Sequence, residues 1–285
     1  MERVAIVSKP QQKELANVLP TLIEWLRAHG MEPILDSESA AYAESAPAVP
    51  RVQLPTHHPR LVIMLGGDGT LLSVARIFAA TGTPILSVNL GHLGFLTEVS
   101  LGELYSTLEG WLARRHQIDQ RAMLHASQWR NGERLAVFEA LNDVVLSKAS
   151  IARMGEFTIE LDGRTAASFR ADGLIVATPT GSTAYNLSAN GPIVTPDVDA
   201  MVITPICPHL LTLRPMVVRG DASLTLRVAG VPDQTILTVD GQRAIELHLG
   251  DEVRCRRSRH TVNLVRIRQS TFFDVLRSKL SWGER

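Results

Sequence analysis

The chain has 285 residues, of which 45% are hydrophobic and 20% are charged. This length can form one large domain or two medium domains, each with its own core. Lysine plus arginine and aspartate plus glutamate both number 29, so the formal net charge is zero. Without an overall field, binding to nucleic acid or to a membrane surface is not expected.

The cysteines and the N-terminus indicate the compartment. Cys207 and Cys255 lie far apart in the sequence, which favours a reducing environment without a disulfide framework, and both are predicted to be small buried residues. Val4–Val7 is typical of a buried first strand and is too short for the apolar core of a signal peptide. No apolar run reaches the roughly 18 residues that a membrane span needs. A cytoplasmic protein is therefore expected.

The first 120 residues alternate between strand and helix patterns. Strands are predicted over Val4–Val7, Met31–Leu35, Leu61–Leu65 and Pro84–Val88, and helices over Gln11–His29, Thr70–Ala80 and Leu101–Arg114. Ser37–Pro59 is rich in Ala, Ser and Pro and is predicted to be a surface loop or mobile connection. Wholly apolar strands that alternate with helices indicate a parallel sheet covered on both faces, so residues 1–120 are expected to form a Rossmann-like α/β domain.

From Arg121 onward, strands follow strands. Asn131-Gly132 and Asp162-Gly163 are favoured hairpin dipeptides between β-type runs. Strands are predicted over Met123–Arg130, Glu133–Ser147, Phe157–Leu161, Arg164–Arg170, Leu174–Ala177, Ser223–Val228, Thr235–Val239, Glu252–Arg256 and Val262–Ile267. Residues 121–267 are therefore expected to form an antiparallel, sandwich-like β domain. A last helix over Thr271–Leu280 belongs to a tail, 268–285, that is expected to pack on the N-terminal domain.

A glycine-rich turn follows the strand Leu61–Leu65. Gly66-Gly67-Asp68-Gly69-Thr70 lets the backbone approach a ligand closely, and a helix start offers free N–H groups that suit phosphate. The turn matches neither the Walker pattern nor GxGxxG. An aspartate inside a phosphate cradle repels phosphate unless it binds a metal ion or accepts a proton from an attacking hydroxyl. A helix N-cap is the structural alternative for Asp68.

A second segment, Asp172–Tyr185, joins the strand Leu174–Ala177 to a turn dense in small hydroxyl residues. Thr178, Thr180, Ser182 and Thr183 offer short hydrogen-bonding groups, and Tyr185 offers a flat face. Such a loop suits adenine and ribose recognition. The alternative is a turn that only caps the next helix.

Both segments resemble parts of one kinase superfamily. GGDGT resembles the motif shared by NAD kinases and by diacylglycerol and sphingosine kinases. DGLIVATPTGSTAY, continuing through Asn190-Gly191-Pro192, looks like the signature of bacterial NAD kinases, which lipid kinases lack. Asn89–Leu96, Leu141–Val144 and Val239–Gln242 resemble further motifs of the family, in the family's order. The segments after Ser188 and between Pro205 and Pro215 look most like Gram-negative members.

The resemblance implies the NAD kinase fold and the transfer of a phosphoryl group from ATP to the adenosine ribose 2′-hydroxyl of NAD. It implies a divalent cation, Mg²⁺ by preference, held on the nucleotide phosphates near Asp68, with no metal ligand assigned directly. It also implies a homo-oligomer, a dimer or tetramer built through the β-rich domain. NAD and ATP are the expected partners, with no nucleic acid and no membrane.

Site residues follow from the same resemblance. In the family the site lies between the two domains. Asp68 is expected to be the catalytic carboxylate, as general base, metal-linked group or both. Asn142 and Asp143 are expected to hold the adenosine half of NAD, and Asp172 the nicotinamide half. The remaining candidates are the phosphate-binding Gly67, Gly69 and Thr70, the NAD-binding Arg170, Thr180, Ser182, Thr183, Ala184, Tyr185, Ser188 and Gln242, and the ligand contact His92. For His92 and Arg170, an ordinary surface position is the alternative.

Two other functions remain open at this stage. A lipid kinase of the diacylglycerol type explains Asp68 but not the segment Asp172–Tyr185. A non-catalytic dinucleotide sensor would lack a chemical residue, yet all four candidates are present: Asp68, Asn142, Asp143 and Asp172.

Overall fold

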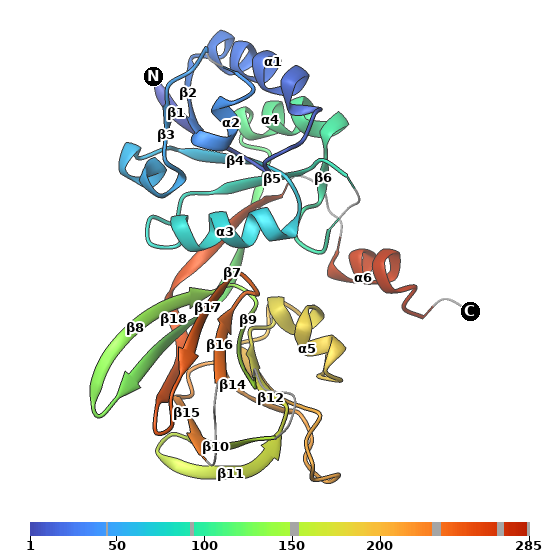
Figure 1. Cartoon of the computed structure of the whole chain (residues 1–285). Coiled ribbons are helices and arrows are strands. Elements are labelled where there is room, and N and C mark those ends of the chain that lie inside the picture. The colour runs from blue at the N-terminus through green and yellow to red at the C-terminus, as the bar shows by residue number, and fades with distance from the viewer. Residues whose placement is uncertain (44, 92–93, 149–153, 230–234, 267–270, 284–285) are drawn as a thin grey trace. The chain divides into compact units, whose positions relative to one another are not determined.

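The computed structural model describes residues 1–43, 45–91, 94–148, 154–229, 235–266 and 271–283. The chain divides into two compact units (Figure 1). Unit 1 comprises Met1–Gln120 and Thr261–Arg285, and unit 2 comprises Arg121–His260. Unit 2 is therefore inserted into the chain of unit 1, and the second boundary falls after residue 260 rather than after residue 267.

Unit 1 contains a parallel sheet. Its strands are β1 (Glu2–Ser8), β2 (Met31–Asp36), β3 (Ala48–Val49), β4 (Leu61–Leu65), β5 (Ile85–Asn89) and β6 (Val99–Ser100). They run in the order β3-β2-β1-β4-β5, with β6 paired to the end of β5. Leu264 of the last strand, β18 (Glu252–Arg266), pairs in parallel with Ile85. The strands β4 and β5 are buried along their whole length, as expected for a parallel sheet with both faces covered.

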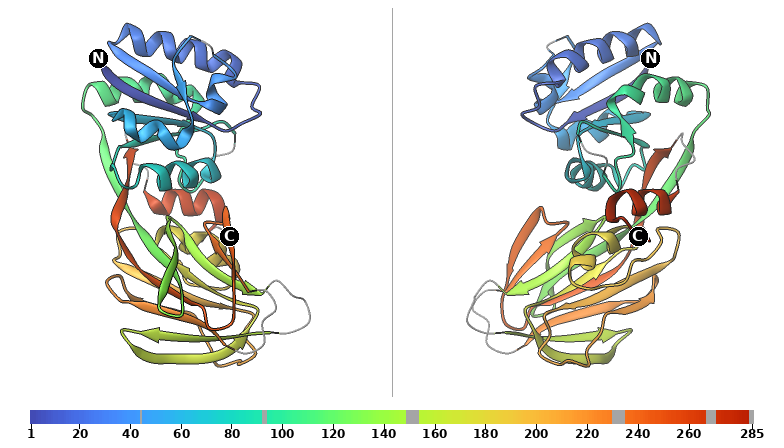
Figure 2. Two further views of the ribbon diagram at one scale, coloured as in Figure 1. Left: turned by 60° about the vertical axis from the view of Figure 1, so that its left-hand side comes forward. Right: turned by 90° about the vertical axis from the view of Figure 1, so that its right-hand side faces the viewer.

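Helices cover this sheet (Figures 1 and 2). They are α1 (Leu15–Ala28), α2 (Ser37–Ala40), η1 (Arg51–His57), α3 (Asp68–Phe78), η2 (Leu101–Glu103) and α4 (Leu104–Leu112). The last helix, α6 (Phe272–Leu280), also belongs to unit 1. The apolar faces of α1 and α4 share one core with β1, β2, β4 and β5. The helix α3 lies on the opposite face of the sheet, where it buries Leu71, Val74 and Phe78 (Figure 1). The Rossmann-like arrangement expected from the alternation is confirmed.

The segment Ser37–Pro59 differs from the predicted surface loop. It holds α2, β3 and η1, and the buried Asp36 organises it. The Asp36 carboxylate accepts a hydrogen bond from the Ser39 amide at 2.9 Å, which caps α2. It also pairs with Arg51 at 2.7 Å. The polar, proline-rich composition of this segment does not predict these short elements. The ion pair between Asp36 and Arg51 holds them, and local periodicity does not.

Unit 2 consists of two groups of antiparallel strands. One sheet has the order β14-β13-β12-β9-β16-β17. Its strands are β9 (Asp143–Lys148), β12 (Gly173–Ala177), β13 (Ala200–Ile206), β14 (Met216–Arg219), β16 (Thr235–Val239) and β17 (Arg243–Leu247). The other group contains β7 (Gln117–Arg130), β8 (Glu133–Ala140), β10 (Gly155–Leu161), β11 (Arg164–Ala171), β15 (Leu224–Ala229) and the first part of β18.

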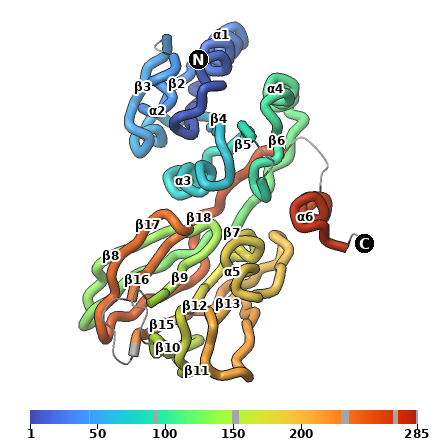
Figure 3. The backbone as a smooth tube through the Cα atoms, turned by 45° about the vertical axis from the view of Figure 1, so that its right-hand side comes forward, coloured from blue at the N-terminus to red at the C-terminus, as the bar shows by residue number. Residues whose placement is uncertain are grey.

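The core of unit 2 follows from strand alternation. On β9, Val144 and Leu146 join a core shared with strands of the other group, whereas Val145 joins a smaller cluster with Ile175 and Val194. Successive side chains of a strand point to opposite faces, so β9 contributes to both. The short helix α5 (Tyr185–Ser188) lies beside this sheet in the tube view (Figure 3). The sandwich-like β domain is confirmed.

Three strand predictions were wrong in detail. Glu133–Ser147 is two strands, β8 and β9, which the chain breaks at Leu141 and Asn142 to enter another sheet. The two predicted strands after residue 251 are the single strand β18.

Cys207 is exposed rather than buried, whereas Cys255 is buried as predicted. Among the described residues, no helix has the length and apolar character of a membrane span.

Candidate active site

The glycine turn of unit 1 lies at the point where the strand order reverses. The chain leaves β1 toward β2 and β3 and then returns to place β4 beside β1, with Ser8 opposite Leu65. Ligands of open α/β sheets bind outside the carboxyl ends of the strands at such a switch point. Gly66–Thr70 directly follows β4 there, so the fold brings the turn to the edge of the sheet where ligands bind.

Asp68 is the first residue of α3 and not its N-cap. Gly67 is the N-cap, with extended backbone, and the carbonyl of Gly67 accepts hydrogen bonds from the amides of Thr70 and Leu71. The Asp68 carboxylate takes no part in capping the helix. The alternative of a purely capping aspartate is therefore not supported.

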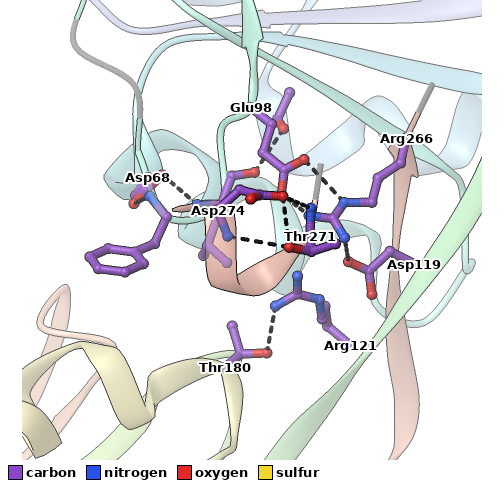
Figure 4. Close-up of polar contacts among 11 residues, drawn as sticks. Asp68, Glu98, Asp119, Arg121, Thr180, Arg266, Thr271 and Asp274 are labelled. Atoms are coloured by element: carbon purple, nitrogen blue, oxygen red, sulfur yellow. Dashed lines mark hydrogen bonds and ion pairs between the residues drawn. The ribbon is translucent and has the colours of Figure 1, made fainter. Parts of the chain in front are cut away.

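The Asp68 carboxylate is held by the loop that follows β5 (Figure 4). It accepts hydrogen bonds from the amide of Phe95 at 2.9 Å and from the amide of Leu96 at 3.2 Å. The hydroxyl of Thr97 donates a third at 3.0 Å. A carboxylate fixed by three donors has one orientation, which is the preorganisation that a catalytic or metal-linked group requires.

That loop is braced in turn by polar side chains at the end of β5. The side-chain amide of Asn89 donates to Thr97 Oγ1 at 2.8 Å, and Ser87 Oγ donates to the carbonyl of Leu96 at 3.0 Å. Gly94 leaves the space that Asp68 occupies, because a Cβ at Gly94 would overlap the Asp68 carboxylate. The Asn89–Leu96 motif therefore acts by positioning Asp68.

A second centre lies in unit 2, where a cavity of about 340 Å³ opens on the face of β9 that carries Val145. The turn before β9 contributes Asn142, and β9 itself contributes Asp143 and Ser147. Ala184 and Tyr185 line the cavity from the segment that starts α5, and the β16–β17 hairpin contributes Thr238, Asp240 and Gly241. Four of the predicted site residues, Asn142, Asp143, Ala184 and Tyr185, thus line one cavity.

Asp240 fastens the β16–β17 hairpin to the turn before β9. Its carboxylate accepts hydrogen bonds from the amides of Leu141 at 3.1 Å, Asn142 at 2.7 Å and Asp143 at 3.2 Å. In return the Asp240 amide donates to the carbonyl of Asp143 at 3.0 Å. Asp240 adopts a left-handed backbone conformation (φ 49°) in the Asp-Gly turn, and aspartate is one of the residues that tolerate this conformation.

Asn142 and Asp143 carry the polar groups that these contacts leave for a ligand. Asn142 Oδ1 is buried and has no hydrogen-bond partner among the described residues. Asp143 is 4% exposed, and burial, reinforced by the charge of Asp240, raises the pKa of its carboxyl group to about 7. Buried polar groups without partners are uncommon and mark sites where a ligand completes the hydrogen bonding.

The hydroxyl-rich turn is mostly used for its own architecture. Ser182 Oγ donates to the carbonyl of Val194 at 3.1 Å and accepts from the Val194 amide at 3.0 Å. Thr180 is buried and accepts a hydrogen bond from Arg121 at 3.3 Å (Figure 4). Gly181 lies so close to Asn142 that a Cβ there would overlap the Asn142 carbonyl. The turn supports the cavity wall, and Ala184 and Tyr185 at its end form the surface.

The remaining predicted residues lie away from the cavity lining. Asp172 pairs with Lys148 at 2.5 Å, and the exposed Arg170 lies 4.0 Å from Glu156. Ser188 and Gln242 are exposed, and Thr183 Oγ1 donates to the carbonyl of Thr180 at 3.4 Å. His92 lies outside the described residues. In unit 1, Gly67, Gly69 and Thr70 stay together in the turn around Asp68.

Sequence reasoning missed the residues that position the others. Asn89 and Thr97 support Asp68 from a distance of 21 and 29 positions along the chain, and only the Asn89–Leu96 motif hinted at them. Asp240 lies in the motif Val239–Gln242, but Gln242 is the residue of that motif predicted to bind NAD. No local pattern indicates that a hairpin carboxylate will bind amides 97 to 99 positions away.

A further cavity of about 330 Å³ lies in unit 1, behind the loop that holds Asp68. Leu96 and Glu98 line it, together with Arg266, which pairs with Glu98 and lies 3.3 Å from Asp119 (Figure 4). None of the predicted site residues lines it. Within the described residues, no group of three or more His, Cys, Asp or Glu side chains is arranged to hold a metal ion.

Comparisons with known proteins cover the whole chain. Residues 4–116 match the ATP-NAD kinase N-terminal domain, and residues 141–267 match the ATP-NAD kinase C-terminal domain. NAD kinases of Acidobacterium capsulatum and Koribacter versatilis are 62% and 50% identical over 100% of both chains. Yeast NADH kinase, crystallised with NADH, is 26% identical with a TM-score of 0.91, covering 100% of this chain and 89% of that one. An Archaeoglobus fulgidus NAD kinase, in complex with ATP, shares the fold at 24% identity, with a TM-score of 0.78 and 98% of each chain covered.

Proposed function

The chain belongs to the ATP-NAD kinase family, and we propose that its two centres divide the reaction between them. The reaction is phosphorylation of NAD by ATP, giving NADP and ADP. In the proposal, the glycine turn of unit 1 binds the triphosphate and the cavity of unit 2 binds the adenosine half of NAD. The observation that carries this division is the cavity lined by Asn142 and Asp143, where Asn142 Oδ1 is buried and has no hydrogen-bond partner among the described residues.

In unit 1, Gly67, Gly69 and Thr70 at the start of α3 would contact the phosphate oxygens. The positive end of the helix dipole favours negative charge at this position. Asp68 would act on the acceptor hydroxyl, since a fixed carboxylate assists as the proton of a weakly acidic hydroxyl departs. The contacts to Phe95, Leu96 and Thr97 support this role by fixing the carboxylate.

A magnesium ion fits this centre as a cation held mainly by phosphate. Mg²⁺ in kinase sites takes one or two carboxylates together with substrate phosphates, and Asp68 supplies one carboxylate. When bound, the ion offsets the negative charge of the triphosphate. Asp68 would then have two roles: to orient the acceptor hydroxyl and to help hold the cation beside the phosphates.

In unit 2, Asn142 and Asp143 would bind the ribose hydroxyls of the adenosine half, and Tyr185 would lie beside the base. Asp172, Arg170, Ser188 and Gln242 would contact the rest of the dinucleotide, with Asp172 on the nicotinamide half. Thr180, Ser182 and Thr183 would support the cavity wall.

One assay tests the proposal. Purified protein is given ATP, Mg²⁺ and either NAD or diacylglycerol, and NADP or phosphatidate is measured. We expect NADP alone. Phosphatidate in place of NADP would favour a lipid kinase, and binding of NAD without turnover would favour a dinucleotide sensor.

We also propose that the protein is a cytoplasmic homo-oligomer, a dimer or tetramer assembled through unit 2. The edge strand β14 and the segment before it expose apolar side chains at Leu211, Met216 and Val217, which an interface would cover. Both cysteines are free thiols, in agreement with a reducing compartment. Sedimentation at the assay concentration tests the assembly, and a fully active monomer there would refute it.

A further inference from the structure

The cavity of unit 2 contains two buried carboxyl groups that differ in their hydrogen bonding. Asp240 is 6% exposed and accepts hydrogen bonds from three backbone amides. Hydrogen bonds to a carboxylate favour its charged form, so Asp240 carries the negative charge. Asp143 is 4% exposed, and no hydrogen bond to its side chain is found in the described part of the chain.

Two neighbouring buried carboxyl groups do not both ionise readily, because each charge disfavours the other. The group without donors therefore keeps its proton. Burial first, and the charge of Asp240 second, raise the pKa of Asp143 to about 7. Asp240 and Tyr185 are the titratable groups that line the cavity with Asp143. A neutral carboxyl group can donate a hydrogen bond, which a carboxylate cannot.

We propose that Asp143 recognises NAD as a neutral carboxyl group that donates a hydrogen bond to a ribose oxygen of the adenosine half, and that Asp240 is the positioning residue that keeps it neutral. The inference rests on the proposed function, because it takes the cavity as the adenosine site. Asn142 Oδ1 supplies an acceptor beside this donor. The pair of residues thus presents one donor and one acceptor, which match the two capacities of a hydroxyl group.

The test is calorimetric titration of NAD into the full-length protein without ATP, between pH 6 and pH 9, in two buffers that differ in ionisation enthalpy. NAD carries no group that titrates in this range. If only the protonated form binds, NAD binding at pH 8 takes up a proton, and Kd rises about 16-fold between pH 7 and pH 8.5. Proton release, a Kd that falls with pH, or a Kd without pH dependence would each overturn the inference.

Variants separate the roles of the two carboxyl groups. Asp143→Asn keeps a donor but does not titrate, so its Kd is expected to be independent of pH, with no proton uptake. Asp240→Asn removes the neighbouring charge, so the rise of Kd should begin at lower pH. Glu246→Gln, an exposed carboxylate on the next strand, is the matched control and should behave as the unmodified protein. An Asp240→Asn profile identical to that of the control would remove Asp240 from the proposal.

Failure of the inference and failure of the proposed function give different results. If Asn142→Ala weakens NAD binding while binding takes up no proton, the cavity remains the adenosine site and Asp143 binds in its charged form. If NAD binds as tightly to Asn142→Ala as to the unmodified protein, the cavity is not the adenosine site and both proposals fail.

Discussion

Each unit of the molecule places one aspartate at its centre, and the two aspartates have opposite surroundings. Asp68 in unit 1 is partly exposed and accepts three hydrogen bonds from the loop after β5. Asp143 in unit 2 is buried, and its neighbour is another carboxyl group. The same side chain is thus fixed as a charged acceptor in one place and as a proton-bearing group in the other. The surroundings of each aspartate, rather than the residue type, determine its chemical role.

The largest expected effect comes from the carboxylate of unit 1. Asp68→Asn keeps the size of the side chain but removes the charge that would assist the departing proton. We expect turnover to fall by at least about 100-fold, the order of a lost general base. Calorimetric titration of the variant with NAD should give an affinity close to that of the unmodified protein. Turnover that is unchanged in Asp68→Asn would show that this carboxylate has no part in the chemistry.

The second prediction concerns the support of Asp68 rather than Asp68 itself. Gly94→Ala places a methyl group where the Asp68 carboxylate lies, so the carboxylate must move. A displacement of about 1 Å at a reacting group costs up to about 100-fold, and we expect kcat to fall between about 10- and 100-fold. Steady-state kinetics give the measurement.

A matched glycine controls for Gly94→Ala. A Cβ at Gly102 meets nothing within 4 Å, so Gly102→Ala should retain its kcat. If Gly94→Ala and Gly102→Ala have the same kcat, the loop after β5 does not position Asp68.

The third prediction moves to unit 2. Asn142→Ala removes the buried oxygen for which the described residues provide no hydrogen-bond partner. Loss of one hydrogen bond to a bound ligand is worth about 1 to 1.5 kcal/mol, so the KM for NAD should rise roughly tenfold. The KM for ATP should change much less. A rise in the KM for ATP alone would place Asn142 with the donor instead of the acceptor.

The smallest effect is on stability. Burial raises the pKa of Asp143 to about 7 in the folded protein, above its ordinary 3.8. At pH values between 3.8 and about 7, the folded protein therefore keeps a proton that the unfolded chain has lost. The stabilising contribution of the protonated form is complete below about pH 4 and is lost as the pH rises through 7. Between pH 6 and pH 8 the free energy of unfolding should fall by about 1 kcal/mol because of this group.

Asp143→Asn should remove that part of the pH dependence, and urea denaturation of both proteins at the two pH values gives the comparison. Parallel pH profiles for the two proteins would contradict a neutral Asp143 in the fold.

Much of this comparison could be predicted from the sequence, but unevenly. Leu61–Leu65 and Thr235–Val239 were placed at their observed bounds because apolar runs and β-branched residues report strands locally. Asp68 was identified because a strand, a glycine turn and a helix follow one another in the chain. Asp240 and Thr97 were not identified, because their partners are 97 to 99 and 29 positions away and only the folded chain brings them together.

The division of the chain has a consequence for its synthesis. Unit 1 is made of Met1–Gln120 and Thr261–Arg285, so its last strand pairing, Leu264 with Ile85, needs residues that the ribosome adds only after unit 2. All of unit 2 leaves the ribosome before unit 1 can be completed. The sheet that carries the glycine turn and Asp68 therefore lacks its pairing with β18 until unit 2 has been synthesised. A message truncated after residue 260 would yield a chain that contains every proposed site residue and still lacks the end of β18, which pairs with β5 in the first unit.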